Sequence, residues 1–351
     1  MSKFWSDAVK RADPYVPGEQ LNQADMIKLN TNENPYPPSP KVIEAIRMEA
    51  EFALNLYPSP TVDGLREDIA SYYKLTKENV FIGNGSDEVL AFSFMAFFEA
   101  EKKIRFPEIS YSFYPVYAKL FNIPYDAIKL GEDFTIVPDD YFQSEGGVIF
   151  PNPNAPTSIF LELGAVKQIL DNNLNKVVIV DEAYIDFAEA SAVSLLQDYP
   201  NLLVVQTMSK SRSLAGLRVG FALGSEELIE GLTRVKDSFN SYTIDRLAIA
   251  GAQAAINDQA YFRETTEKIL ATREWLVTEL QKRDFFVLPS QTNFLFIRHK
   301  AWPAEDLYMR LKDNNILVRY FNKPKIDNYL RITIGTDADM KRLLEVLDKL
   351  K

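Results

Sequence analysis

The feature that most constrains the fold of this chain is a series of short apolar segments separated by stretches with helical patterning. Several of these segments are rich in valine and isoleucine without alternating polar residues, as expected for strands buried on both faces of a parallel sheet. Strands that alternate with helices indicate an α/β domain. The strand candidates are residues 79–83, 103–106, 147–150, 176–180, 202–207 and 218–223.

The last third of the chain has a different pattern. A long amphipathic helix over about residues 257–282 precedes four apolar segments, FFVLP, TNFLFIR, ILVRY and LRITIG, and then a final helix. This order predicts a smaller α+β domain. A chain of 351 residues is also too long for one small core. We therefore predict an N-terminal arm (1–27), a segment joining the small domain (28–48), a large domain (49–246) and a small C-terminal domain (247–351).

The composition excludes several classes of chemistry. The chain has no cysteine, which rules out disulfides, zinc–thiolate sites and thiol nucleophiles. Its single histidine, His299, has no neighbours that suggest a triad or a metal site, and no metal is predicted. The net charge is −10 without a dense basic block, so nucleic acid is not an expected partner. No apolar run is long enough for a membrane span, and no secretory signal is visible, so we expect a cytoplasmic protein.

Each of five strand candidates runs directly into an unusual polar segment. These segments are NGSDE, PEISYSFY, PNPNAPT, DEAY and MSKS, in chain order. Ligands of open α/β sheets bind beyond the carboxyl ends of the strands. The five segments are therefore expected to converge on one edge of the sheet and to form a site there.

The chemistry of this site can be anticipated from a few residue types. The glycines before Ser86 and Asp87 lead into a helix, whose N-terminus suits a phosphate, although either residue could be a plain N-cap. Asp181 ends an apolar strand and needs a cation or donors there, either from a ligand or from a structural ion pair. Lys210, just past a strand, could form a Schiff base or be a surface lysine. Arg218 begins its strand, so that strand must run antiparallel to the others if the arginine is to reach the same edge.

Three motifs in this order, NPNAPT, VDEAY and SKSRSLAGLRVG, resemble the fold-type-I aminotransferases of classes I and II. The segments LNTNENPYPPSP, NLYPSP and LRITIGT are similar to the histidinol-phosphate branch of that family. The resemblance covers essentially the whole chain. It implies an α/β fold in which a mostly parallel seven-stranded sheet with one antiparallel strand lies between helices in a large, cofactor-binding domain, beside a smaller α+β domain.

The resemblance also implies that the cofactor is pyridoxal 5′-phosphate. Lys210 would form the Schiff base with it and later move a proton. Asp181 would pair with the pyridine nitrogen and keep it protonated, which makes the ring an electron sink. Tyr184 and Asn154 would contact the phenolic oxygen of the ring, and Tyr111 would stack on the ring face.

Further residues match the family's anion sites. The cofactor phosphate would be held by Ser86, Asp87, Ser209 and Arg218, together with Tyr57 of a neighbouring subunit, which implies a homodimer. Arg331 would clamp the substrate α-carboxylate, and Arg319 with Tyr15 from the arm would hold the substrate phosphate. For both arginines to face the cofactor, the ILVRY and LRITIG strands must pair as neighbours.

The predicted reaction is amino transfer between histidinol phosphate and 2-oxoglutarate, in histidine biosynthesis. Alternatives are an aromatic amino acid aminotransferase, a phosphothreonine decarboxylase of the same fold, and a non-catalytic protein that kept the cofactor. The chain departs from the family's usual NPNNPTG at Ala155 and Ser158, and from its usual small or apolar residues at Ser211 and Arg212. Because of this alanine, the motif alone does not show which residue of the segment would contact the ring oxygen.

Overall fold

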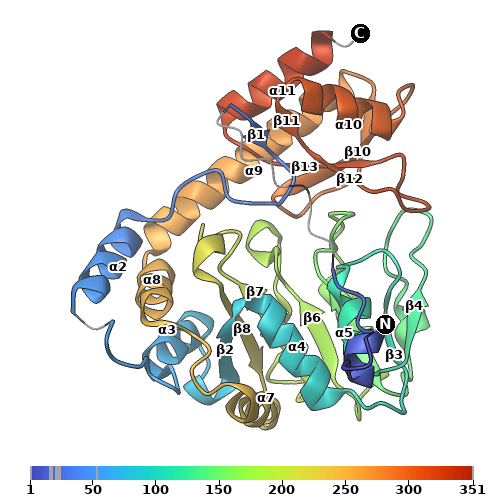
Figure 1. Ribbon diagram of the computed structural model, residues 1–351. Coiled ribbons are helices and arrows are strands. Elements are labelled where there is room, and N and C mark those ends of the chain that lie inside the picture. The colour runs from blue at the N-terminus through green and yellow to red at the C-terminus, as the bar shows by residue number, and fades with distance from the viewer. Residues whose placement is uncertain (1, 16–18, 20–24, 53, 350–351) are drawn as a thin grey trace.

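The chain folds into a larger lower part built around one wide sheet and a smaller upper part, joined by a long helix (Figure 1). This computed structural model describes residues 2–15, 19, 25–52 and 54–349. The predicted arm, residues 1–27, therefore falls partly outside the described residues.

The wide sheet has seven strands in the spatial order β2-β8-β7-β6-β5-β3-β4. Every described pairing is parallel except those of β8, which runs antiparallel to both β7 and β2. This confirms the predicted mixed sheet. The strands are β2 (Val80–Asn84), β3 (Ile104–Pro107), β4 (Tyr125–Ile128), β5 (Gly147–Pro151), β6 (Val178–Asp181), β7 (Leu202–Thr207) and β8 (Val219–Gly224).

Helices cover both faces of this sheet because alternate residues of its buried strands point to opposite sides. Val178 and Val180 join a core with helices α3 and α6, whereas Ile179 joins a core with α4, α5 and α7. The large part is thus a three-layer α/β/α structure. Its helices are α2 (Pro40–Phe52), α3 (Asp63–Tyr73), α4 (Gly85–Phe97), α5 (Phe113–Phe121), α6 (Leu163–Asp171), α7 (Glu226–Phe239) and α8 (Arg246–Asn257), with short 3₁₀ turns η1 (Lys77–Asn79), η2 (Pro138–Tyr141), η3 (Ile185–Phe187), η4 (Ala192–Leu195) and η5 (Ala215–Leu217).

The upper part has its own core and a four-stranded antiparallel sheet in the order β12-β13-β10-β9. Strands β12 and β13 are neighbours, and Arg319 lies directly opposite Arg331, which confirms the predicted pairing. A two-residue strand of the early chain, β1, adds in parallel to β11. The elements are β1 (Ile27–Lys28), α9 (Gln259–Gln281), β9 (Phe285–Val287), β10 (Phe294–His299), α10 (Ala304–Asp313), β11 (Ile316–Leu317), β12 (Arg319–Tyr320), β13 (Leu330–Thr333) and α11 (Asp337–Lys349).

The described residues of the arm contact both parts of the molecule. Helix α1 (Asp7–Arg11) lies against α5, where the Arg11 guanidinium donates to two main-chain carbonyls, and Asp13 forms an ion pair with Lys119 at 2.8 Å. Further along, Glu19 pairs with Lys312 of α10 at 2.7 Å. The arm thereby links the large sheet domain to the small one.

Helix α8 belongs structurally with the large part, because its buried residues share a core with α3 and pack beside α2. The chain crosses to the small part along α9, the long diagonal helix of Figure 1. The predicted domain limits stay a prediction. Among the described helices, none combines the length and apolar character of a membrane span.

Candidate active site

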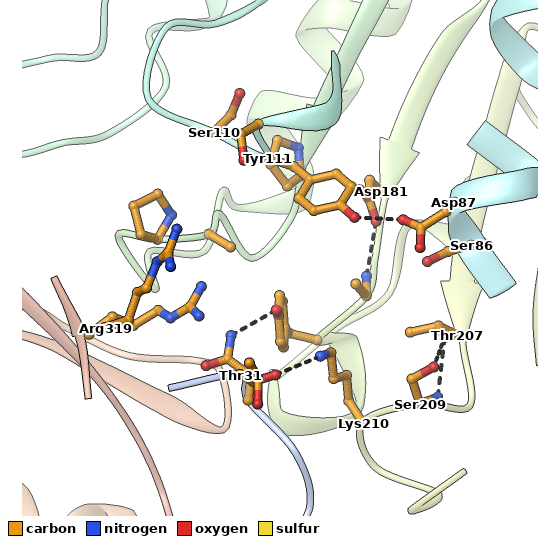
Figure 2. Close-up of a pocket in the computed structure, with 18 of the residues that line it drawn as sticks. Thr31, Ser86, Asp87, Ser110, Tyr111, Asp181, Thr207, Ser209, Lys210 and Arg319 are labelled. Carbon is orange, nitrogen blue, oxygen red and sulfur yellow. Dashed lines mark hydrogen bonds between the residues drawn. The ribbon is translucent and has the colours of Figure 1, made fainter. Parts of the chain in front are cut away.

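A pocket lies where the large and small parts meet, at the carboxyl edge of the wide sheet. All five predicted polar segments contribute to its wall, which confirms their convergence. Figure 2 shows residues from these segments facing Arg319 across the pocket. The lining residues are Tyr15, Asn30, Thr31, Asn32, Ser86, Asp87, Ser110, Tyr111, Ser112, Pro151, Ala155, Pro156, Asp181, Ala183, Tyr184, Thr207, Ser209, Lys210, Arg218, Arg319, Phe321 and Arg331.

One end of the pocket is formed by the N-terminus of α4. Gly85 opens this helix with φ +79°, and a side chain there would lie 2.4 Å from an Arg218 nitrogen. A side chain at Gly220 would lie 2.2 Å from the backbone nitrogen of Ser86. Glycine at both positions therefore lets the helix start approach β8 closely. Free N–H groups of a first helical turn beside a guanidinium form a site for an anion.

Arg218 is held toward this end by side chains from two other segments. Its Nη2 donates to Asp87 at 3.0 Å, and its Nη1 reaches the Ser209 hydroxyl at 3.5 Å. The Tyr111 hydroxyl donates to the other Asp87 oxygen at 2.5 Å. Arg218 adopts φ 55°, a left-handed conformation that is rare outside glycine. The residue just before β8 thus has an unfavourable backbone geometry, and its side chain reaches the start of α4.

Asp181 is the buried carboxylate at the floor of the pocket, only 4% exposed. Burial raises its pKa to about 6, although a hydrogen bond from the Tyr114 hydroxyl at 2.8 Å opposes the shift. The main-chain N–H of Ala183 also donates to it, at 3.3 Å. No described cation pairs with this carboxylate, so it can accept a positively charged partner from a ligand.

Lys210 projects into the pocket from the segment after β7. Its Nζ donates to the main-chain carbonyl of Thr31 at 3.2 Å (Figure 2) and lies 5.8 Å from the centre of the Tyr184 ring. No carboxylate of the described residues lies within ion-pair distance of it. A lysine amine that is not neutralised by a carboxylate can act as a nucleophile or as a base.

The small part supplies two guanidinium groups to the opposite wall. Arg331 donates to the main-chain carbonyl of Asn30 at 2.7 Å, while its buried Nε has no hydrogen-bond partner within the described chain. Burial lowers the pKa of Arg331, and the neighbouring charge of Arg319 lowers it further. Two like charges directly opposite on paired strands are destabilising. This wall is therefore suited to receive one or more anionic groups.

Aromatic rings border the same wall. Tyr15 of the arm packs on Phe113 with ring centroids 4.5 Å apart, so the arm reaches the pocket itself. Phe321 lies under both arginines, with its ring centre 5.4 Å from the Arg319 guanidinium carbon and 5.7 Å from that of Arg331. An aromatic ring therefore lies close to both guanidinium groups on this wall.

The structure brings most predicted site residues together, but two of them lie elsewhere. Asn154 is buried behind the wall, where its amide donates to the Ile109 carbonyl and to Thr157, and Ala155 faces the pocket instead. Tyr57 lies on the surface, stacked on Tyr242. The predicted residues that line the pocket are Tyr15, Ser86, Asp87, Tyr111, Asp181, Tyr184, Ser209, Lys210, Arg218, Arg319 and Arg331.

Sequence reasoning missed two side chains that support this site. Tyr114 holds Asp181 from behind, and Asn32 donates to the Tyr184 hydroxyl at 2.8 Å. Tyr114 lies in the first turn of α5, three residues after Tyr111, and this spacing is the signal that could have indicated a second inward tyrosine. Asn32 lies in the Pro- and Asn-rich loop of residues 29–40. The pattern of this loop does not indicate which of its residues points toward the pocket.

The departures from the family pattern have local explanations. Ser158 adopts φ 68°, where glycine is usual, and its hydroxyl donates to the Pro289 carbonyl of the small part at 3.0 Å. Arg212 is buried against the Phe262 ring, 3.7 Å from its centre, and donates to the Ala255 carbonyl at 2.8 Å. Ser211 donates to Asp186. Each of these three side chains thus forms a hydrogen bond to another segment of the chain.

The family of this chain is shown by a family model that matches nearly its whole length. The model described as "Aminotransferase class I and II" matches residues 24–347. The chain belongs to this family. Curated relatives include a histidinol-phosphate aminotransferase 1 of Oceanobacillus iheyensis, 63% identical over 99% of this chain and 98% of the relative. A histidinol-phosphate aminotransferase of Clostridium botulinum is 56% identical over 100% of this chain and 99% of the relative.

Solved structures of aminotransferases agree with the fold. A histidinol-phosphate aminotransferase of Sinorhizobium meliloti, solved in complex with pyridoxal-5′-phosphate, has a TM-score of 0.89 at 23% identity, covering 100% of this chain and 99% of the other. The histidinol-phosphate aminotransferase of Clostridium acetobutylicum has a TM-score of 0.86 at 24% identity, covering 93% and 99%. The fold of this chain is thus the fold-type-I aminotransferase fold that the motifs implied.

Proposed function

We propose that this chain is a cytoplasmic enzyme of histidine biosynthesis that transfers an amino group between histidinol phosphate and 2-oxoglutarate, with pyridoxal phosphate as cofactor. In the biosynthetic direction, glutamate would donate the amino group to imidazole acetol phosphate. The names of the full-length relatives support this substrate. The observation that carries the proposal is a pocket lined by a lysine without a carboxylate partner among the described residues, a buried carboxylate and two facing arginines.

The residues of the pocket fit this cofactor at both of its polar ends. The α4 N-terminus with Arg218 suits a phosphate, because both the helix dipole and the guanidinium favour negative charge. The buried carboxylate of Asp181 suits a protonated ring nitrogen, whose charge would offset the cost of burial. Lys210 lines the same pocket, and Tyr184 and Tyr111 also border the space.

Each residue has a defined task in such a reaction. Pyridoxal phosphate, when bound, supplies a carbonyl that reacts with amino groups and a ring that accepts the electron pair left by a departing proton. Lys210 would hold the cofactor through its amine, and once freed would carry the proton between neighbouring carbon atoms of substrate and cofactor. Asp181 would keep the ring nitrogen protonated, and Arg218 would anchor the phosphate so that the reacting atoms stay aligned.

One pocket must accept two different substrates in turn. Histidinol phosphate carries a phosphate and no carboxylate, whereas glutamate carries two carboxylates and no phosphate. Arg331 would bind the α-carboxylate of glutamate, and Arg319 with Tyr15 would bind either the phosphate or the distal carboxylate. Arginine can contact both anions with paired hydrogen bonds, so the same wall serves both half-reactions.

A single-turnover experiment tests the proposed substrate. The cofactor-loaded protein is mixed with histidinol phosphate, glutamate or phenylalanine, and loss of its visible absorption band is followed. Conversion by histidinol phosphate and glutamate at much lower concentration than by phenylalanine supports the proposal. Preferred conversion by phenylalanine would identify an aromatic aminotransferase instead. Release of carbon dioxide from phosphothreonine, without amino transfer, would identify the decarboxylase.

The same proposal includes a homodimer, for which the surface offers an apolar patch. Large apolar side chains gather along the end of α2, the loop that follows it and the end of α7. Exposed apolar side chains in these segments suit an interaction site. The most exposed are Phe52 at 78%, Tyr57 at 79% and Phe239 at 71%, beside Met48, Leu54, Leu56 and Tyr242.

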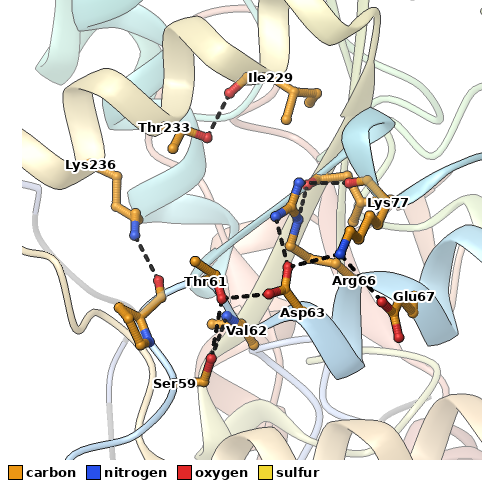
Figure 3. Close-up of polar contacts among 12 residues, drawn as sticks. Ser59, Thr61, Val62, Asp63, Arg66, Glu67, Lys77, Ile229, Thr233 and Lys236 are labelled. Atoms are coloured by element: carbon orange, nitrogen blue, oxygen red, sulfur yellow. Dashed lines mark hydrogen bonds and ion pairs between the residues drawn. The ribbon is translucent and has the colours of Figure 1, made fainter.

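The loop that carries Tyr57 is anchored just beyond this tyrosine. Lys236 donates to the Pro60 carbonyl at 3.0 Å, and the Thr61 hydroxyl donates to Asp63 at 2.8 Å (Figure 3). The main-chain N–H of Val62 donates to the Ser59 hydroxyl at 3.1 Å. These hydrogen bonds hold the loop while the Tyr57 ring stays exposed. Tyr57 is therefore suited to contact the phosphate end of a second copy's pocket.

Mixing two impaired variants tests whether the site is shared. A dimer of Tyr57→Phe and Lys210→Ala subunits would contain one site with both changes and one with neither. We expect activity to return on mixing, to about a quarter of the wild-type value at the same subunit concentration, because about half of the dimers would be mixed and each would have one intact site. Efficient subunit exchange without any return of activity would contradict a shared site.

A further inference from the structure

We propose that Asn32 is a positioning residue that sets the proton direction of Tyr184, so that the tyrosine hydroxyl donates into the pocket. The inference rests on the proposed function, because the recipient would be the ring oxygen of pyridoxal phosphate. It concerns a side chain to which neither the motifs nor the comparisons assign a role.

The evidence is a chain of hydrogen bonds that joins the small part to the pocket. The main-chain N–H of Asn32 donates to the Thr333 hydroxyl at 3.0 Å, and this hydroxyl donates to the Asn32 amide oxygen at 3.1 Å. The Asn32 amide nitrogen then donates to the Tyr184 hydroxyl at 2.8 Å. Asn293 donates to the Asn32 carbonyl at 3.0 Å, and Asn32 itself is 1% exposed. Both polar atoms of the Asn32 amide therefore have hydrogen-bond partners within the protein.

This order of donors determines where the tyrosine proton points. A phenolic oxygen has one proton to donate and can accept hydrogen bonds from others. Since Asn32 acts as donor, the Tyr184 proton must be directed at another acceptor. The described residues give Tyr184 no side-chain or main-chain acceptor, and the tyrosine lines the pocket. The proton is therefore available to a ligand oxygen.

The departure at Ala155 makes this donor more important. The family's usual NPNNPTG has an asparagine at this place, whereas here Ala155 and Pro156 line the pocket without a side-chain donor. Asn154 does not replace it, because both amide protons already have acceptors behind the wall. We infer that in this chain the Tyr184 hydroxyl, ordered by Asn32, is the main side-chain donor to the ring oxygen.

The experiment measures the pH at which the visible band of the cofactor-loaded protein changes. A hydrogen-bond donor to the ring oxygen stabilises the negative charge of that oxygen and so lowers the pKa of the cofactor's titrating proton. Losing the donor therefore raises the pH at the midpoint. Asn32→Gly is the variant of choice. Asn32 has φ 56°, which glycine adopts freely, so the change removes the side chain without straining the backbone.

We expect Asn32→Gly to raise the midpoint by about 0.5–1 pH unit, the shift that corresponds to one neutral hydrogen bond. Tyr184→Phe should raise it at least as far, and the double variant should equal Tyr184→Phe alone, because Asn32 acts only through the tyrosine. Thr333→Val, which frees the amide oxygen of Asn32, should give a smaller shift in the same direction.

Asn34→Ala is the matched control. This neighbouring asparagine also donates across the loop, to the Ser211 carbonyl at 3.0 Å, but does not line the pocket. It should lower the melting temperature without moving the midpoint. An unchanged or lowered midpoint in Asn32→Gly, or a shift that persists in the Tyr184→Phe background, would overturn the positioning role. If the wild-type protein itself forms no visible band with pyridoxal phosphate, the proposed function fails instead.

Discussion

The two walls of the pocket differ in how far the protein satisfies its own polar groups. On the large-domain wall, Arg218 is paired with Asp87, and Asp181 accepts hydrogen bonds from Tyr114 and a main-chain N–H. On the small-domain wall, Arg319 and Arg331 face each other, and the buried Nε of Arg331 has no partner within the described chain. The first wall holds its arginine in an ion pair before any ligand arrives, whereas the second depends on an anion to offset the repulsion between its two arginines.

This difference matches the proposed division of labour. A cofactor that stays bound through every turnover needs fixed contacts, because reacting atoms must stay aligned. Substrates that alternate between phosphate and carboxylate need a wall whose donors remain available. We therefore expect changes in the large-domain wall to affect all substrates, and changes in the small-domain wall to discriminate among them.

The largest effect is expected for Lys210→Ala, which removes the amine from the large-domain wall. Turnover with every donor should fall by about 10³-fold or more, because general acid–base catalysis alone contributes about 10²–10⁴-fold. The visible band of the wild-type protein should also be lost. Borohydride reduction followed by peptide mapping checks the assignment, and a label on any other lysine would contradict it.

Arg319→Ala should separate the substrates. Loss of a charge-assisted contact of about 1.5–3 kcal/mol corresponds to about 10–150-fold in kcat/KM for histidinol phosphate and for glutamate. Phenylalanine has no distal anion and should be nearly unaffected. Arg298→Ala is a suitable control, because Arg298 is exposed on the same sheet and does not line the pocket. An equal loss for phenylalanine would mean that Arg319 has only a structural role.

The smallest effect concerns the stability of the ligand-free protein. The pKa of Asp181 is raised from 3.8 to about 6, so between these values the folded state keeps a proton that the unfolded state has released. The free energy of unfolding therefore falls as pH rises through this window, and it stays reduced above it. Asp181→Asn removes this penalty. Its free energy of unfolding, relative to that of the wild type, should therefore increase by about 1–3 kcal/mol between about pH 4 and about pH 8.

Urea denaturation of both ligand-free proteins at the two pH values measures this difference. Glu182 and other titrating groups are common to both proteins, so their contributions cancel to first order. A gap that does not change with pH would show that the Asp181 carboxylate is not penalised by burial. The same variant should bind the cofactor less tightly, which separates the stability effect from the functional one.

The sequence allowed the large-domain wall to be predicted better than its supports. Lys210, Asp181 and Arg218 follow or precede recognisable strands, so strand order alone brings them to one edge. Strand β4 (Tyr125–Ile128) was missed because it lies at the sheet edge and is only partly buried, which leaves no apolar run to detect. The two-residue strand β1 is too short to give a pattern.

The supports of the site were harder to predict because they depend on contacts between distant segments. Tyr114 reaches Asp181 across 67 residues of sequence, and Asn32 reaches Tyr184 across 152. Nothing in the local pattern specifies such a pairing. The placement of Asn154 shows the same limitation, since a shift of one residue decides whether an amide or the methyl group of Ala155 faces the pocket.

The left-handed backbone of Arg218 has a consequence for laboratory evolution. A non-glycine residue in this conformation costs about 1–2 kcal/mol, and the partly exposed Arg218–Asp87 pair returns only about 0–1 kcal/mol. Glycine at this position would relieve the backbone while removing the charge that the anion site needs. A library selected for heat resistance alone would therefore enrich this change and discard the phosphate anchor. Selection on this scaffold must retain cofactor binding as a criterion at every round.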